Sequence, residues 1–213
     1  MIDFAQGIDT ANSLLEQTLA KAVMSCLVIP SGLVEDLKAL RLQLTSVIGV
    51  LSAEELVPLF TLSLYLNGYR VTREDTCSGR RFWVTEVQNP DGVVYFGIAA
   101  LVDKPDDLVY YQDCMIRLGF VSGVLCMIGT ESVANPLPNA IVLTGRSYIS
   151  QSLFILAVHQ YVENVMEIAV ATGANPSFRQ ALQAVLMQDP QLTGDTITAT
   201  SKRWATLLGS RTQ

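Results

Sequence analysis

Histidine is almost absent from the 213-residue sequence, since His159 is the only one. A metal site with two histidines therefore cannot form within one chain. Glu163 lies four residues on, which favours a solvated contact along a helix over a metal-binding pair. Neither GxxxxGK[ST] nor GxGxxG occurs. The aspartates Asp103, Asp106 and Asp107 lack the glutamate that closes a calcium loop. We predict no catalytic residue, metal site or cofactor, and a protein that is not an enzyme.

Charged residues and long apolar runs are also scarce. Charged residues make up 16% of the chain, against about 25% in typical domains, while 50% are hydrophobic and the mean hydropathy is +0.34. A membrane span needs roughly 18 consecutive apolar residues. The run 118–129 is too short, and 153–170 is interrupted by polar residues. We predict no membrane span, and we interpret the apolar excess as an oligomer interface or a binding groove.

The chain begins without a basic segment, because its first lysine is Lys21, so we read no signal peptide. A net charge of −6 and a pI near 4.7 disfavour a nucleic-acid partner, because phosphate binding needs a basic face. We expect a soluble, cytoplasmic protein whose thiols act as small apolar residues in a reducing compartment. The four cysteines show no CxxC spacing: Cys26, Cys77, Cys114 and Cys126.

Leucine and valine recur at helical spacing along the first fifty residues. This pattern predicts one helix that includes 14–27 and a second over 33–51. Ser52 and Glu55 then have the spacing of a capping box. They predict a third helix that extends to about Asn67.

After residue 68 the hydrophobic period changes from helical to alternating. We predict strands over 69–73, 80–88 and 93–102, with a polar loop over 74–79. The Asn-Pro-Asp-Gly segment at 89–92 is a strong turn signal. These residues predict a three-strand meander.

The second half of the chain mixes apolar runs with turns. The runs 120–131 and 139–149 contain glycines or follow prolines, which favours a second hairpin over two helices. An amphipathic helix is expected over 150–172, and two more helices follow, the last over 195–208. Between the meander and the second hairpin we predict a helix through about 118, with a buried stripe of Leu108, Tyr111, Met115 and Leu118.

Together these elements predict an α+β fold. One five-stranded antiparallel sheet, a three-strand meander plus a hairpin, carries packed helices on one face. The domain prediction is an N-terminal helical extension over 1–51 containing a helical pair, an α+β core over 52–173 and a C-terminal helical tail over 174–213.

The order helix, three strands, helix, two strands, helix over 52–172 resembles class I type III secretion chaperones and the related YbjN-type domains. The resemblance also includes the Asn67-Gly68-Tyr69 exit from the first helix of the core, and the acidic pI. It implies a small acidic homodimer that holds a non-globular segment of a client protein in an extended state. An exposed sheet edge and apolar pockets would serve that role.

Two groups of residues are candidates for binding. Arg80 and Arg81 stand beside Phe82 and Trp83, as in a patch for a base or a phosphate, but the acidic chain favours a strand end with its arginines in solvent. The alternation of side chains does not tell which sheet face is buried, so the candidate client contacts could equally be ordinary core. These are Trp83, Val87, Tyr95 and Phe96.

The function predicted from these features is a non-catalytic peptide- or protein-binding module, a chaperone or adaptor that holds a non-globular segment of a client. Its partners are a client or partner protein and a second copy of the chain, with no nucleic acid. The alternative is a structural subunit of a larger assembly, such as a capsid, coat or secretion component. In that reading the terminal helices would be docking arms.

Overall fold

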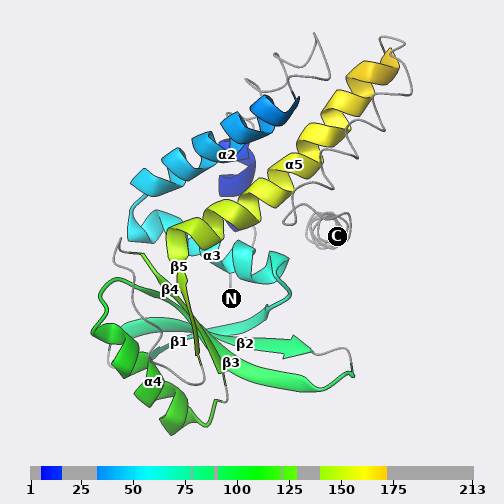
Figure 1. The fold of residues 1–213 in the computed structure, drawn as a ribbon. Helices are drawn as coiled ribbons and strands as arrows, with labels where there is room; N and C mark the ends of the chain where they lie inside the picture. The colour runs from blue at the N-terminus through cyan, green and yellow to red at the C-terminus, as the bar shows by residue number, and fades with distance from the viewer. Residues whose placement is uncertain are drawn as a thin grey trace. The chain divides into compact units, whose positions relative to one another are not determined.

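The computed structural model of the chain (Figure 1) describes residues 6–15, 33–77, 79–88, 91–120, 122–128 and 140–171. The chain forms two compact units. We call Met1–Ile8 with Ile48–Ile149 the sheet unit, and Asp9–Val47 with Ser150–Gln213 the helical unit. The predicted domain boundaries follow helix ends, whereas these units divide within helices. The helices predicted after residue 173 lie outside the described residues.

The sheet unit contains a single five-stranded sheet in which the strands follow one another in sequence order. The first three strands form the predicted antiparallel meander. The fold is therefore α+β, with the meander confirmed. The strands are β1 (Arg70–Cys77), β2 (Arg80–Gln88), β3 (Val94–Val102), β4 (Ser122–Met127) and β5 (Ala140–Thr144).

The prediction of five antiparallel strands is wrong. β4 pairs with β3 in parallel, and β5 pairs with β4 in parallel, so the second hairpin does not exist. The reason lies in α4 (Asp107–Leu118), which connects β3 to β4. A helix between two adjacent strands carries the chain back to the starting end of the sheet, and the second strand then runs parallel to the first. The connection between β4 and β5, residues 129–139, lies outside the described residues.

The first strand is longer than the sequence predicted. β1 continues through the expected loop 74–79 as far as Cys77, and it pairs with β2 throughout, with one irregularity between Val71 and Arg73. Its polar residues are compatible with a strand because β1 is the last strand on its side of the sheet, where side chains reach solvent. One of them, Glu74, forms an ion pair with Arg81 at 2.8 Å.

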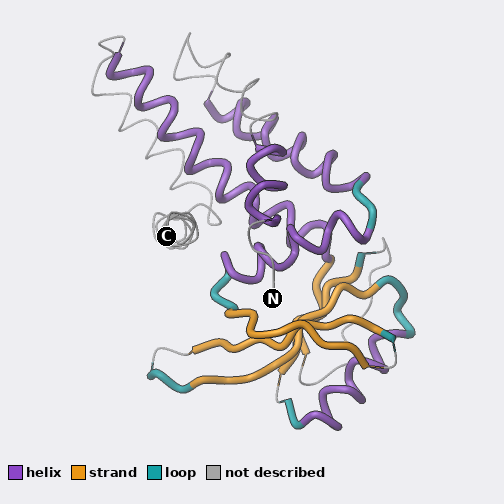
Figure 2. The backbone as a smooth tube through the Cα atoms, turned by 180° about the vertical axis from the view of Figure 1, so that it is seen from behind, coloured by secondary structure: helices purple, strands orange, loops and turns teal. Residues whose placement is uncertain are grey.

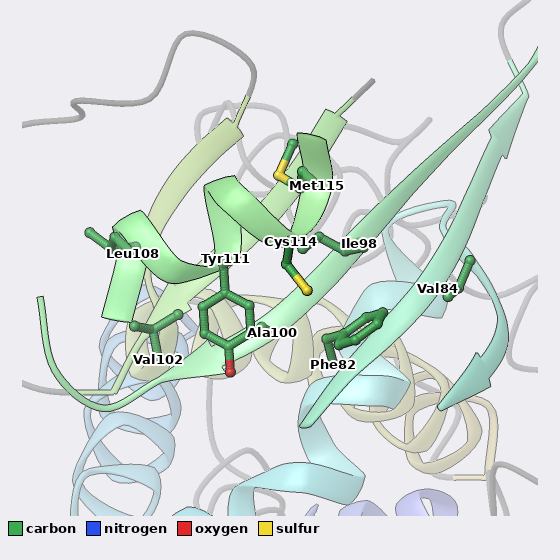
Figure 3. Close-up of a cluster of buried hydrophobic side chains, with 9 residues drawn as sticks. All are labelled: Phe82, Val84, Ile98, Ala100, Val102, Leu108, Tyr111, Cys114 and Met115. Carbon is green, nitrogen blue, oxygen red and sulfur yellow. The ribbon is translucent and has the colours of Figure 1, made fainter. Parts of the chain in front are cut away.

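Helices cover both faces of the sheet, so the prediction of helices on one face is also wrong. α4 covers one face, and α3 (Ala53–Leu66) covers the other (Figure 1). On the α3 side, the rings of Phe60 and Trp83 meet edge to face with centroids 5.4 Å apart. The α4 side is a cluster of nine buried residues (Figure 3): Phe82, Val84, Ile98, Ala100, Val102, Leu108, Tyr111, Cys114 and Met115.

The ends of α4 agree with the sequence, but one member of its predicted stripe does not. The helix ends at Gly119, which has a left-handed backbone with φ of 71°. Leu118, predicted to be buried, is exposed, and Cys114 is buried instead. Residues 108, 111, 114 and 115 lie along one face of the helix. Residue 118 lies in the last turn, next to the terminating glycine.

The predicted capping box at the start of α3 is confirmed. The Glu55 backbone N–H donates to the Ser52 hydroxyl at 3.4 Å, and the Ser52 backbone N–H donates to the Glu55 carboxylate at 2.7 Å. The Ser52 hydroxyl also donates to the Glu55 carboxylate at 2.7 Å, and this bond, together with the one from the Ser52 backbone, lowers the pKa of Glu55. A short helix over 6–15 approaches α3 closely: a Cβ atom at Gly7 would lie 2.7 Å from the Pro58 carbonyl oxygen. Only glycine allows this approach without a shift of the backbone.

Arg146, near the start of α5 (Gly145–Ala171), connects its own segment of the sheet unit to two distant ones, at residues 48–51 and at residue 128. Its guanidinium donates to the carbonyls of Ile48 at 2.6 Å, Leu51 at 2.9 Å and Ile128 at 3.2 Å. The last turn of α2 (Leu33–Val50) contains no basic residue of its own. Arg146 therefore supplies the positive charge that the carbonyl end of a helix favours.

In the helical unit, α2 packs against α5. The Thr45 and Ser150 hydroxyls are hydrogen bonded at 3.0 Å, and the Arg41 guanidinium lies 4.5 Å from the centre of the Phe154 ring. On α2, Leu37, Leu40 and Leu44 are buried, whereas Val47 is exposed. The predicted start of α5 is five residues too late, because the helix begins at Gly145 rather than Ser150.

Candidate protein-binding surface

The outer part of the β2–β3 hairpin extends past its neighbouring strands. β1 pairs with β2 only up to Glu86, opposite Arg70, and β4 pairs with β3 only from Gly97, opposite Ser122. Among the described residues, the strand segments beyond these points pair only within the β2–β3 ladder (Figure 2). We call residues 87–88 and 91–96 the hairpin arm.

The arm exposes an unusual run of large apolar side chains. Val93, Val94, Tyr95 and Phe96 are consecutive, and each is between 43% and 50% exposed. Because successive side chains of a strand point to opposite faces, both faces of the arm are apolar. The four residues therefore offer contacts on two sides of one ribbon, with backbone edges alongside.

The register places a partner opposite three of these side chains, and Val94 lies opposite Gln88. Tyr95 lies opposite Val87, and Phe96 lies opposite Glu86. At the turn, the Gln88 side-chain amide donates to the Gly92 carbonyl at 3.2 Å, and Gly92 has φ of 82°. Part of the predicted turn, residues 89 and 90, lies outside the described residues.

The four candidate client contacts do not lie together. Val87, Tyr95 and Phe96 belong to the hairpin arm, and the last two are exposed. Trp83 is only 2% exposed and packs on Phe60 under α3. In this structure the Trp83 side chain cannot touch a client, and it belongs to the core.

The charges near the arm are few and partly paired. Arg70 and Glu86 form an ion pair at 3.4 Å beside Phe96, and the Arg70 side chain is mostly exposed. Asp91 lies at the turn. A segment that binds the arm would meet apolar side chains first and a small number of charges at their margin.

The arginines at the start of β2 are held in ion pairs. Arg80 donates to the Asp107 carboxylate through Nε at 3.0 Å and through Nη2 at 2.6 Å, and it lies 4.5 Å from the Tyr110 ring centre. The hydrogen bond to Asp107 raises the pKa of Arg80. Arg81 pairs with Glu74. Carboxylates thus already bind both cations, which is unlike an open site for phosphate, and both arginine side chains are partly exposed to solvent, as predicted.

The remaining candidates give no chemical site in the described part of the chain. No group of three or more His, Cys, Asp or Glu side chains there is arranged to hold a metal ion. Asp106 occupies the N-cap position of α4 without a side-chain capping bond. The backbone of His159 and Glu163 belongs to α5, and their side chains lie outside the described residues.

Family models, curated proteins and solved structures contain no match to this chain. The resemblance to type III secretion chaperones and YbjN-type domains therefore stays a prediction. Within the described residues, no helix has both the length and the apolar character needed to cross a membrane.

Sequence reasoning missed that the hairpin arm is a separate surface. It identified the residues of the hairpin but treated β2 and β3 as uniform strands. The available signal was the run Val93–Phe96, four large apolar residues in succession beside a turn. A strand with one covered face alternates apolar and polar residues, so this run indicated either full burial or an exposed apolar surface.

Proposed function

We propose that this chain is a non-catalytic protein-binding module, a chaperone or adaptor, that holds an extended segment of a client protein on its hairpin arm. The observation that carries the proposal is the apolar run Val93–Phe96, exposed on a two-stranded ribbon that extends beyond the neighbouring strands. An extended segment can add to a free strand edge by backbone hydrogen bonds, while its side chains pack on the ribbon.

The expected energies make a single arm a weak binding site. Burying one half-exposed aromatic side chain contributes roughly 1 kcal/mol, and each new backbone hydrogen bond contributes about 1 kcal/mol. Association itself costs at least about 4 kcal/mol. A few such contacts therefore exceed this cost by only a small margin.

A homodimer would overcome this weakness, and we include it in the proposal. Two arms that bind one client, or two sites of one client, raise the effective concentration of the second contact. The acidic chain, with a net charge of −6, is suited to such a role in the cytoplasm, where clients for secretion are held unfolded. Nucleic acid is not among the proposed partners, because its backbone would be repelled.

The test begins with purification of the tagged protein from its own cells and identification of bound proteins by mass spectrometry. The bound segment of each candidate client is then mapped by deletion and made as a labelled peptide. Fluorescence anisotropy measures its affinity for the wild type and for the double variant Tyr95→Ser, Phe96→Ser. We expect the double variant to bind at least about tenfold more weakly, from the loss of roughly 1–2 kcal/mol of apolar contact.

A matched control removes equal apolar surface elsewhere. The double variant Val109→Ser, Ile116→Ser alters two residues on the outer side of α4, which are 64% and 72% exposed. It should bind the peptide as the wild type does. If the arm variant stays folded and keeps wild-type affinity, the arm is not the binding surface and the proposal fails.

The alternative function is a structural subunit of a larger assembly, and α4 is the observation that favours it. Val109, Ile116 and Leu118 are all exposed on this helix, and the first two are seven residues apart, on one helix face. Sedimentation velocity over a range of concentrations separates the two functions. A closed dimer supports the binding module, whereas growth of larger assemblies that Val109→Ser, Ile116→Ser abolishes supports the subunit.

A further inference from the structure

The adjoining ends of β1 and β2 lie against one face of α4. Asp107, Tyr111 and Cys114 are spaced four and three residues apart, so they lie along one helix face. Asp107 binds Arg80 at 2.6 Å, and the Tyr111 hydroxyl donates to the Arg81 carbonyl at 3.1 Å. The third contact on this face is between thiols.

Cys77 packs against the buried cluster that contains Cys114, and the two thiols interact with each other. The sheet register explains why Cys77 faces the helix. Cys77 lies directly opposite Arg80, and residues opposite each other on paired strands point to the same face. Phe82, two residues beyond Arg80, belongs to the buried cluster under α4 (Figure 3). Cys77 packs against the same cluster.

The two thiols have different access to solvent. Cys114 is fully buried, whereas Cys77 is partly exposed at the end of β1. Burial, together with the interaction with Cys77, raises the pKa of Cys114 to about 11. Cys114 is therefore kept as a protonated thiol near neutral pH, and a dissolved oxidant reaches Cys77 first.

We propose that Cys77 and Cys114 are a redox modification site, at which a peroxide converts the two thiols to a reversible disulfide between β1 and α4. The Cys77 sulfur attacks one peroxide oxygen, the O–O bond breaks, and a sulfenic acid and one water form. The Cys114 sulfur then attacks the Cys77 sulfur, and the sulfenic oxygen leaves as a second water. The two thiols lose two electrons and two protons in total, and hydrogen peroxide is reduced to two waters.

The same chemistry reverses in a reducing compartment. A thiol such as glutathione attacks the disulfide and forms a mixed disulfide, and a second thiol completes the reduction. Disulfides of intracellular proteins are commonly of this transient kind. The site thus responds to oxidant without a metal or a bound cofactor, and it is separate from the hairpin arm.

The experiment treats the full-length folded protein with a small excess of hydrogen peroxide. Remaining thiols are blocked in denaturant, and the digested peptides are identified by mass spectrometry without reduction. We expect one linked peptide pair that joins Cys77 to Cys114, and it should form at least about tenfold faster in the folded protein than in urea, because folding holds the two thiols in contact. Equal rates in both states, or a Cys77 linked to a second chain, would overturn the proposal.

Variants make the assignment specific. Cys77→Ser and Cys114→Ser should each abolish the linked pair, while the double variant Cys26→Ser, Cys126→Ser should retain it. The oxidised protein should also melt higher, on the order of 5 °C, because the cross-link restricts the unfolded chain. A Cys77 sulfenic acid that accumulates in the wild type and is trapped by a dione probe would show that Cys114 does not resolve it, which contradicts the proposal.

Discussion

The ladder between β2 and β3 contains an inner and an outer stretch that are similarly apolar but differently covered. In the inner stretch Val84 lies opposite Ile98, and both are buried. In the outer stretch Val87 lies opposite Tyr95, which is 43% exposed. Both stretches belong to the same two strands and are paired in the same register. The difference comes from the neighbours, because β1 and β4 pair only with the inner stretch.

This comparison shows that side-chain chemistry alone does not decide burial. An apolar strand becomes core where helices and further strands cover it, and it becomes a contact surface where they stop. The boundary here falls between Glu86 and Val87 on β2 and between Phe96 and Gly97 on β3. Substitutions on the two sides of this boundary should therefore have opposite consequences for stability and for binding.

The largest expected effect on the free energy of unfolding comes from a substitution in the inner stretch. Trp83→Ala should lower the free energy of unfolding by about 3–5 kcal/mol, because it removes a buried ring that packs on Phe60. Phe96→Ala, on the arm, should change it by less than about 1 kcal/mol. Urea unfolding followed by circular dichroism measures both. Similar losses for the two variants would show that the arm is part of the core.

A smaller effect on the free energy of unfolding is expected from a substitution in α4, which covers the inner stretch. Tyr111→Phe removes the hydrogen bond to the Arg81 carbonyl and should cost about 1 kcal/mol near neutral pH. Burial raises the pKa of Tyr111 from 10.0 to about 12. The folded state thus keeps a proton that the unfolded chain loses, so this contribution is complete below pH 10 and is lost as the pH rises towards 12.

The wild type should therefore lose stability over this alkaline range, on the order of 2 kcal/mol from this residue. Tyr111→Phe should show a correspondingly smaller loss when unfolding is measured at several pH values. Tyr95→Phe is the matched control, since it removes a hydroxyl from the exposed arm, and its alkaline profile should follow the wild type. An unchanged profile for Tyr111→Phe would contradict the burial of its hydroxyl.

The ion pair at the start of α4 should contribute less. Asp107→Asn weakens the two hydrogen bonds from Arg80, and both side chains are partly exposed, so we expect only a small loss of stability. Asp113→Asn disrupts a pair with Arg117 on the outer side of the same helix at 2.8 Å. That control should cost about 0.3 kcal/mol. Thermal unfolding at low and high salt distinguishes them, and equal losses would mean that the Arg80 pair does not hold the start of β2 against α4.

The outer stretch itself should also contribute little to the stability of the fold. Tyr95→Ser with Phe96→Ser should change the free energy of unfolding by about 0.5–1 kcal/mol at most. The same variant should reduce the binding of a dye that fluoresces on apolar surfaces. A large destabilisation would show that the arm is covered by another part of the chain, and the exposed-surface argument would then fail.

Local signals in the sequence predicted α3, α4 and the meander well. The Ser52–Glu55 capping box and Gly119 act within one helical turn, so neighbouring residues suffice to place the helix ends. The direction of β4 could not be read in this way. It depends on how α4 packs across the sheet, and the apolar runs of β3 and β4 are compatible with either direction.

The candidate surface was predictable only in part, for the same reason. Trp83 and Phe96 are both aromatic residues in alternating strands, and nothing in their own surroundings in the sequence tells which one α3 will cover. The Cys77–Cys114 contact is less predictable still, because the two cysteines belong to different elements and meet only when α4 closes over the sheet.

The hairpin arm has a consequence for how this chain can change during evolution. Because its segments pair only within the β2–β3 ladder among the described residues, one residue added to both strands near the turn leaves the Val84–Ile98 register intact. Each such addition lengthens the ribbon by roughly 3.3 Å and exchanges the faces of the residues beyond it. Reach and specificity can therefore vary through short insertions and deletions, while the covered half of the same two strands keeps its sequence constraints.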